Sequence, residues 1–116
     1  MRHRVKGKKL DRKKAPRELM LKNLASSIVI YEKVKTTEAK AKAVKPLLEK
    51  IITISIKGGL NGRRELIRLL PQTMAIKKAI EVLAVKYKDR HGGYLRIIRL
   101  GSRVGDNAKM VQIELV

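Results

Sequence analysis

The chain has 116 residues, with 29 Lys or Arg against 10 Asp or Glu, which gives a formal net charge of +19. This length suits one compact domain, and a hydrophobic share of 44% without Trp or Phe predicts an aliphatic core. The absence of cysteine excludes disulfides and cysteine-based zinc sites. So large an excess of positive charge favours a polyanionic partner, with nucleic acid first and an anionic membrane surface second.

The first segment, residues 1–17, carries nine Lys or Arg and a single Asp. It has almost no apolar residues and no periodicity, so we expect an extended arm that is disordered when free. A solubilising tail is the simpler alternative, but a tail that only solubilises does not need one sign of charge. We therefore predict a basic nucleic-acid-binding arm at residues 1–15 and a single globular domain at residues 16–116.

Amphipathic periodicity predicts a first helix over about residues 16–30. Residues 31–37 contain β-branched residues without a helical pattern, and we expect a strand there. Thr36 or Thr37 is a candidate cap for a second helix, which carries a core-facing apolar stripe and ends at Gly58-Gly59.

Two further helices are expected after the second one. Asn61 is predicted to cap a short helix over residues 62–70. Thr73 is predicted to cap a longer helix over residues 73–87, which has a clean apolar face. Within the second helix, Pro46 either introduces a kink or marks the place where the regular helix begins.

The last stretch, residues 91–116, has the pattern of a β-hairpin. Gly101 and Gly105 can supply positive φ in its turn-rich connector. Apolar and polar residues alternate over residues 111–115, as they do in half-buried strands. We expect this hairpin to be the rigid platform of the fold.

The predicted fold class is α+β: about four helices packed on a small mixed sheet of about three strands, with a basic extended N-terminal arm. The helical stripes predict that Leu48 and Ile80 are core residues. The longest apolar cluster, residues 47–56, is too short and too polar to span a bilayer, so we expect a cytosolic protein.

Catalytic and metal-binding patterns are not found in the sequence. The two histidines, His3 and His91, have no second histidine or cysteine nearby, and the acidic residues form no recognisable pair. The glycines match neither a P-loop nor a dinucleotide fingerprint. We therefore expect a protein that is not an enzyme and has no cofactor, no metal and no small-molecule substrate.

Three arginines in or beside the first strand of the hairpin, Arg96, Arg99 and Arg103, suggest a phosphate-facing surface. The planar fork of an arginine holds a phosphate through two bonds at once. Arg96 and Arg99 fall on opposite faces of that strand, so at least one must lie at an edge or leave the sheet. Tyr94 either stacks on an unpaired base or, more simply, packs in the core. Asp106-Asn107 is turn chemistry.

Several motifs stand in a specific order along the chain: MRHR at the start, Lys35-Thr36-Thr37, Lys40-Ala41-Lys42, Arg63-Arg64, Gly92-Gly93-Tyr94, Arg96-Ile97, Gly101, Arg103, Gly105-Asp106-Asn107-Ala108 and Ile113-Glu114-Leu115-Val116. In this order and spacing the chain resembles the L-seventeen family of bacterial large-subunit ribosomal proteins.

The resemblance implies a non-catalytic component of the large subunit, in the cytoplasm, that binds the large ribosomal RNA. It also implies contacts with neighbouring ribosomal proteins, including a small one of the L-thirty-two family, and no membrane. Together with the charge pattern it predicts RNA contacts at Arg2, His3, Arg4, Lys6, Lys8, Lys9, Arg12, Lys13, Lys14, Arg17, Lys35, Thr36, Thr37, Lys40, Lys42, Arg63, Arg64, Arg90, His91, Gly92, Gly93, Tyr94, Arg96, Arg99 and Arg103.

The alternative from the residues alone is a DNA-associated architectural protein, because charge does not distinguish ribosomal RNA from DNA. Such a protein needs a recognition helix or a ribbon inserted in a groove. The best candidate helix, residues 73–87, carries only Lys77, Lys78 and Lys86 as cations and has no Arg, Asn or Gln reader. A membrane-surface function is weaker still, since no helix combines a basic face with large exposed apolar anchors.

Overall fold

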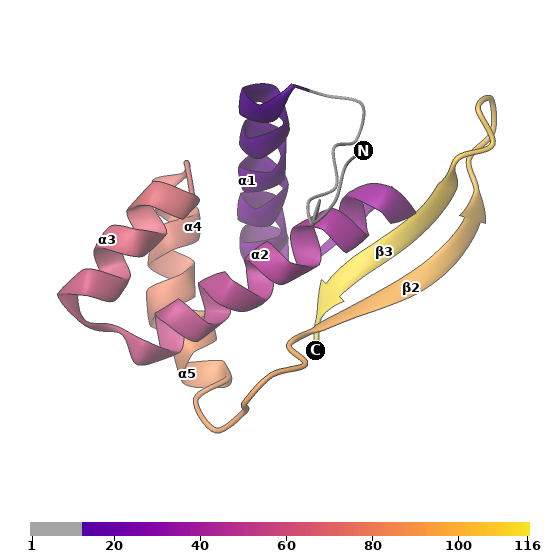
Figure 1. Ribbon diagram of the computed structural model, residues 1–116. Coiled ribbons are helices and arrows are strands. Elements are labelled where there is room, and N and C mark those ends of the chain that lie inside the picture. The colour runs from indigo at the N-terminus through magenta and orange to yellow at the C-terminus, as the bar shows by residue number, and fades with distance from the viewer. Residues whose placement is uncertain (1–12) are drawn as a thin grey trace, which may run out of the picture.

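The computed structural model describes residues 13–116, and most of the predicted arm lies outside this range. The elements follow in the order α1 (Lys14–Tyr31), β1 (Lys33–Thr37), α2 (Glu38–Lys57), α3 (Gly59–Leu69), α4 (Thr73–Lys78), η1 (Ala79–Leu83), α5 (Ala84–Lys86), β2 (Leu95–Ser102) and β3 (Lys109–Leu115) (Figure 1). The predicted α+β class is confirmed, although the sheet is antiparallel throughout rather than mixed. Lys14 and Ala15, which the prediction placed in the arm, are the first residues of α1.

The sheet has the order β1-β3-β2, so β3 lies in the centre and the two other strands are edges. Val34, Ile113 and Ile97 form one row across it and point toward the helical core. The next row along consists of Lys35, Gln112 and Ile98 and points to the opposite, open face, because successive side chains alternate. The predicted alternation in the last strand is confirmed.

The helix α2 is the element on which the rest of the chain packs. It contacts α1, α3, η1, α5 and all three strands, and Figure 1 shows it running between the other helices and the hairpin. Its residues Val44, Leu48, Ile51 and Ile52 are fully buried. Pro46 lies inside α2 on its exposed side, where water can satisfy the carbonyl group that loses its N–H partner. The centre of the fold is therefore this helix rather than the hairpin.

Capping at the two ends of α2 explains where it starts and stops. Thr37 caps it as predicted, since its Oγ1 accepts a hydrogen bond from the N–H of Lys40 at 3.5 Å. Gly58 ends it with a φ of 64°. The prediction that Asn61 caps the next helix is wrong, because α3 already begins at Gly59. Two consecutive glycines in the left-handed region turn the chain so sharply that no linker is needed.

The predicted helix over residues 73–87 is one continuous rod that contains a π-helical turn, η1. Thr73 is its first helical residue, and the expected cap position belongs to Gln72. An α-helix has 3.6 residues per turn, so buried residues spaced four apart gradually rotate around the helix axis. A π-helical turn contains more residues than an α-helical turn and so compensates for this rotation. It thereby keeps four buried residues on one side: Ala75, Ala79, Leu83 and Tyr87.

Candidate nucleic-acid interface

The predicted RNA contacts do not form one continuous surface in the fold. Two smaller groups lie on helices: Lys13, Lys14 and Arg17 at the beginning of α1, and Arg63 and Arg64 on the exposed side of α3. The predicted contacts that lie outside the described residues are Arg2, His3, Arg4, Lys6, Lys8, Lys9 and Arg12.

Two denser groups lie at the two ends of the hairpin. The group at its turn, where β1 runs into α2, contains Lys35, Thr36, Thr37, Lys40, Lys42, Arg99 and Arg103. The group at the opposite end, before and at the start of β2, contains Arg90, His91, Gly92, Gly93, Tyr94 and Arg96. The first of these groups borders a cavity.

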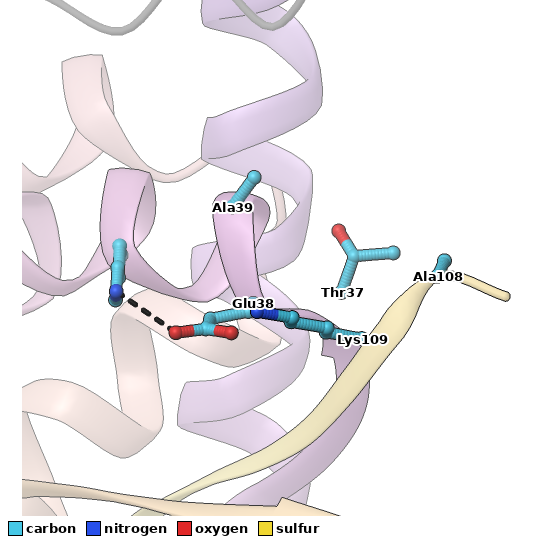
Figure 2. A pocket seen from close by; sticks show the side chains of 6 residues that line it. Thr37, Glu38, Ala39, Ala108 and Lys109 are labelled. Atoms are coloured by element: carbon cyan, nitrogen blue, oxygen red, sulfur yellow. Dashed lines mark ion pairs between the residues drawn. The ribbon is translucent and has the colours of Figure 1, made fainter. Parts of the chain in front are cut away.

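That cavity lies between the first turn of α2 and the beginning of β3, and we name it the α2–hairpin cleft. Its volume is about 470 Å³, and it is lined by Thr37, Glu38, Ala39, Lys42, Ala108 and Lys109 (Figure 2). The fold produces it because Thr37 pairs with Met110 in the sheet and at the same time caps α2. The start of the helix is thereby held beside the end of the hairpin turn.

Glu38 is the charged centre of the α2–hairpin cleft. Its Oε1 lies 2.8 Å from the Nζ of Lys42, one helical turn away. The hydrogen bond and the positive charge of Lys42 lower the pKa of Glu38, and the charges of Arg99 and Lys109 lower it further. Arg99 and Lys109 also line a second, smaller cavity with Glu38. Three cations from three elements thus surround one ionised carboxylate.

The three arginines expected to form a phosphate-facing surface are separated. Arg96 lies on the open face of the sheet, where its Nη2 is 2.9 Å from Oε1 of Glu114. Arg99 shares a row with Thr36 and Val111 and therefore points to the helix side, beside Glu38. A single surface of three arginines is not present.

Arg103 is the third of these arginines and belongs to the hairpin turn. It forms an ion pair with Asp106, whose Oδ1 also accepts a hydrogen bond from the N–H of Ala108 at 3.2 Å. The hydrogen bond from the Arg103 side chain, with a smaller contribution from the N–H of Ala108, lowers the pKa of Asp106 to about 2. Gly105 and Asn107 have φ of 109° and 56°, so the predicted turn chemistry is confirmed.

At the other end of the hairpin, Tyr94 is a packing residue, with 4% of its surface exposed. Its ring lies edge-on to Tyr87, with 5.2 Å between centroids, and its hydroxyl donates to the carbonyl oxygen of Arg90 at 2.9 Å. Tyr87 donates in turn to the main-chain oxygen of Val116 at 2.7 Å. Both rings therefore tie β2 and β3 to the helices. Thr36 is buried as well, so neither Thr36 nor Tyr94 presents a surface to a partner.

The sequence of this chain matches a known protein family and several relatives. The family model for ribosomal protein L17 matches residues 20–116. This chain belongs to that family. The large ribosomal subunit protein bL17 of Orientia tsutsugamushi (strain Ikeda) is 46% identical over 116 residues, which covers 100% of this chain and 80% of the relative. Those of Bradyrhizobium diazoefficiens and Syntrophotalea carbinolica are 45% and 41% identical over the whole chain, covering 84% and 75% of their own lengths. The resemblance seen in the sequence is confirmed.

In this L17-family chain, four residues of the α2–hairpin cleft are not among the RNA contacts predicted from the sequence. They are Glu38, Ala39, Ala108 and Lys109. Glu38 and Lys109 are far apart along the chain, and only the pairing of β1 with β3 brings them together. The only feature of the sequence that could have indicated this site is Lys109, a cation that directly follows the predicted turn.

Two other observations concern residues 13–116 of this L17-family chain. Nowhere in this range do three or more His, Cys, Asp or Glu side chains gather in a way that could hold a metal ion. The same residues contain no helix with the length and apolar character needed to cross a membrane.

Proposed function

We propose that this protein is a structural, non-catalytic component of the large ribosomal subunit that binds ribosomal RNA by neutralising phosphates and by fitting the RNA's shape. The observation that carries the proposal is the surplus of cations. Residues 13–116 hold 23 Lys or Arg, and ion pairs within this range engage only six of them. The others remain for contacts with a polyanion, which offsets their mutual repulsion.

The distribution of these cations favours RNA read by shape. They lie on α1, α3, α2 and the hairpin instead of on one protruding helix. Structured RNA is bound mainly through its backbone and its shape, by contacts spread over several elements. We expect residues 1–15 to form a basic arm that adds further RNA contacts to those of the folded domain.

Two of the three lysines on the candidate recognition helix of the DNA-binding alternative are engaged within the fold. Lys78 and Lys86, on the rod formed by α4, η1 and α5, lie 3.7 Å from the carboxylate of Glu32. Lys78 also donates to the carbonyl oxygen of Ile30 at 2.8 Å. These lysines hold the rod against the end of α1 and are not positioned to read bases. The names of the relatives also point to the ribosome.

Neighbouring large-subunit proteins are the second class of partner that we propose. The resemblance to the L-seventeen family carries this part, including the contact with a small protein of the L-thirty-two family. We place such contacts on the open face of the sheet and the exposed side of α3, beside the RNA contacts predicted there.

Sedimentation with ribosomal particles tests the proposed function. The labelled chain, mixed with large and small subunits stripped by high salt, is expected to sediment with large subunits in a sucrose gradient. An excess of duplex DNA serves as the competitor, and we expect it to remove only a minor part of the bound protein. Equal binding to both subunits, or complete displacement by DNA, would show that the protein is a general polyanion binder.

A further inference from the structure

Most of the surface that lines the α2–hairpin cleft is apolar, although charged side chains line it as well. Figure 2 shows Thr37, Ala39 and Ala108 at the cleft beside Glu38 and Lys109, and Lys42 is the sixth residue that lines it. An apolar wall offers a phosphate no hydrogen bond, whereas it stabilises a flat apolar surface that leaves water. The interior of the cleft is therefore unsuited to the RNA backbone itself.

Cations and one carboxylate lie together at the cleft. Lys42 and Lys109 line it, Arg99 lines the adjoining smaller cavity, and all three attract phosphates. Glu38 is ionised at neutral pH, as glutamates ordinarily are, and its neighbouring cations lower its pKa further, so a phosphate that approaches this carboxylate directly is repelled. Oε1 of Glu38 holds Lys42, and within residues 13–116 its Oε2 has no partner. An ionised carboxylate only accepts hydrogen bonds, so the group that enters must be a donor.

We propose that the α2–hairpin cleft takes one unpaired nucleobase with an exocyclic amino group, which donates to Glu38, while Lys42, Lys109 and Arg99 hold the phosphates on either side. Proteins that read RNA sequence do so at unstacked bases in loops and bulges, which have a flat face and free edges. Cytosine presents an amino donor where uracil presents a carbonyl oxygen, which Glu38 would repel. This inference rests on the proposed function, because it presumes that RNA is bound.

A charge-neutral substitution tests the inference without changing the electrostatic attraction. Ala39→Leu fills the cleft from the exposed first turn of α2, and Thr53→Leu places the same side chain at an exposed position later in the same helix as the matched control. The probes are single-stranded oligocytidylate and a fully paired RNA duplex with the same number of phosphates. Ala39→Leu is expected to weaken binding to oligocytidylate by roughly tenfold, on the scale of one lost base contact. Ala39→Leu should leave duplex binding unchanged, and Thr53→Leu should leave the binding of both probes unchanged.

Glu38→Gln provides the second arm, with a side chain that both donates and accepts. The unaltered protein should bind oligocytidylate more tightly than oligouridylate, and Glu38→Gln should remove most of this preference. The inference is wrong if Ala39→Leu leaves oligocytidylate binding unchanged or if the unaltered chain binds the two oligomers equally. It is also wrong if Ala39→Leu impairs only incorporation into large subunits, which would mean that a protein segment occupies the cleft. If the unaltered protein bound none of the RNA probes, the proposed function itself would be contradicted.

Discussion

Binding of this protein to large-subunit ribosomal RNA should weaken by roughly 10³–10⁵-fold between about 50 and 200 mM salt, which is the range for about six to ten phosphate contacts. Each contact releases counterions condensed on the RNA, and added salt reduces the entropy gained by that release. The net charge of +19 and the many cations without a carboxylate partner in residues 13–116 motivate the expectation. The affinity is measured by fluorescence anisotropy across a salt series.

The control for this salt series is a nonionic solute at the same osmolality. It should leave the affinity unchanged, because it does not compete for phosphates. If the affinity were flat across the salt series, base contacts or apolar contacts would dominate, and charge neutralisation would not be the main source of binding.

Leu48→Ala should lower the free energy of unfolding by about 2–5 kcal/mol, the range for truncating a fully buried leucine. Leu48 has no exposed surface and lies on α2, the helix that contacts most of the other elements. The loss combines buried apolar area with a cavity that its neighbours cannot fill completely. Urea unfolding followed by circular dichroism measures it. Lys50→Ala, on the exposed side of the same helix, is the matched control.

The control Lys50→Ala should change the free energy of unfolding by less than about 0.5 kcal/mol, as surface substitutions do. Ile80 was expected in the core with Leu48, but it is only half-buried and lines two cavities beside α3. Ile80→Ala should therefore destabilise the protein less than Leu48→Ala. If Leu48→Ala were as mild as the control, α2 would not be the centre of the core.

Local periodicity predicted much of this fold. The apolar stripe of α2, the cap at Thr37 and the alternation over residues 111–115 depend on neighbours a few positions away, and all are confirmed. The start of α3 was missed because a helix can restart at Gly59, directly after Gly58 ends α2, without a capping side chain. The π turn was missed because a four-residue spacing is indistinguishable from helical periodicity over one or two turns.

The candidate site was less predictable, because it depends on strand pairing and not on local pattern. Arg96 and Arg103 look like free cations in the sequence, but each has a carboxylate partner that the hairpin supplies. In the sequence, Tyr94 looks like a residue on which a base could stack, but in the fold its ring packs against Tyr87 from another element. The grouping of Arg99 and Lys109 around Glu38 requires the register of all three strands.

The most direct test of the account is incorporation into large subunits when the cations of the α2–hairpin cleft are removed. The variant carries Lys42→Gln, Arg99→Gln and Lys109→Gln together. The matched control removes the same charge from three exposed lysines that form no ion pair within residues 13–116: Lys50→Gln, Lys57→Gln and Lys88→Gln. Circular dichroism establishes that both variants are folded, and sucrose gradients of reconstituted subunits measure incorporation. We expect the cleft variant to be lost from the large-subunit peak and the control to stay in it; equal incorporation of the two would show that these three cations are not needed for docking.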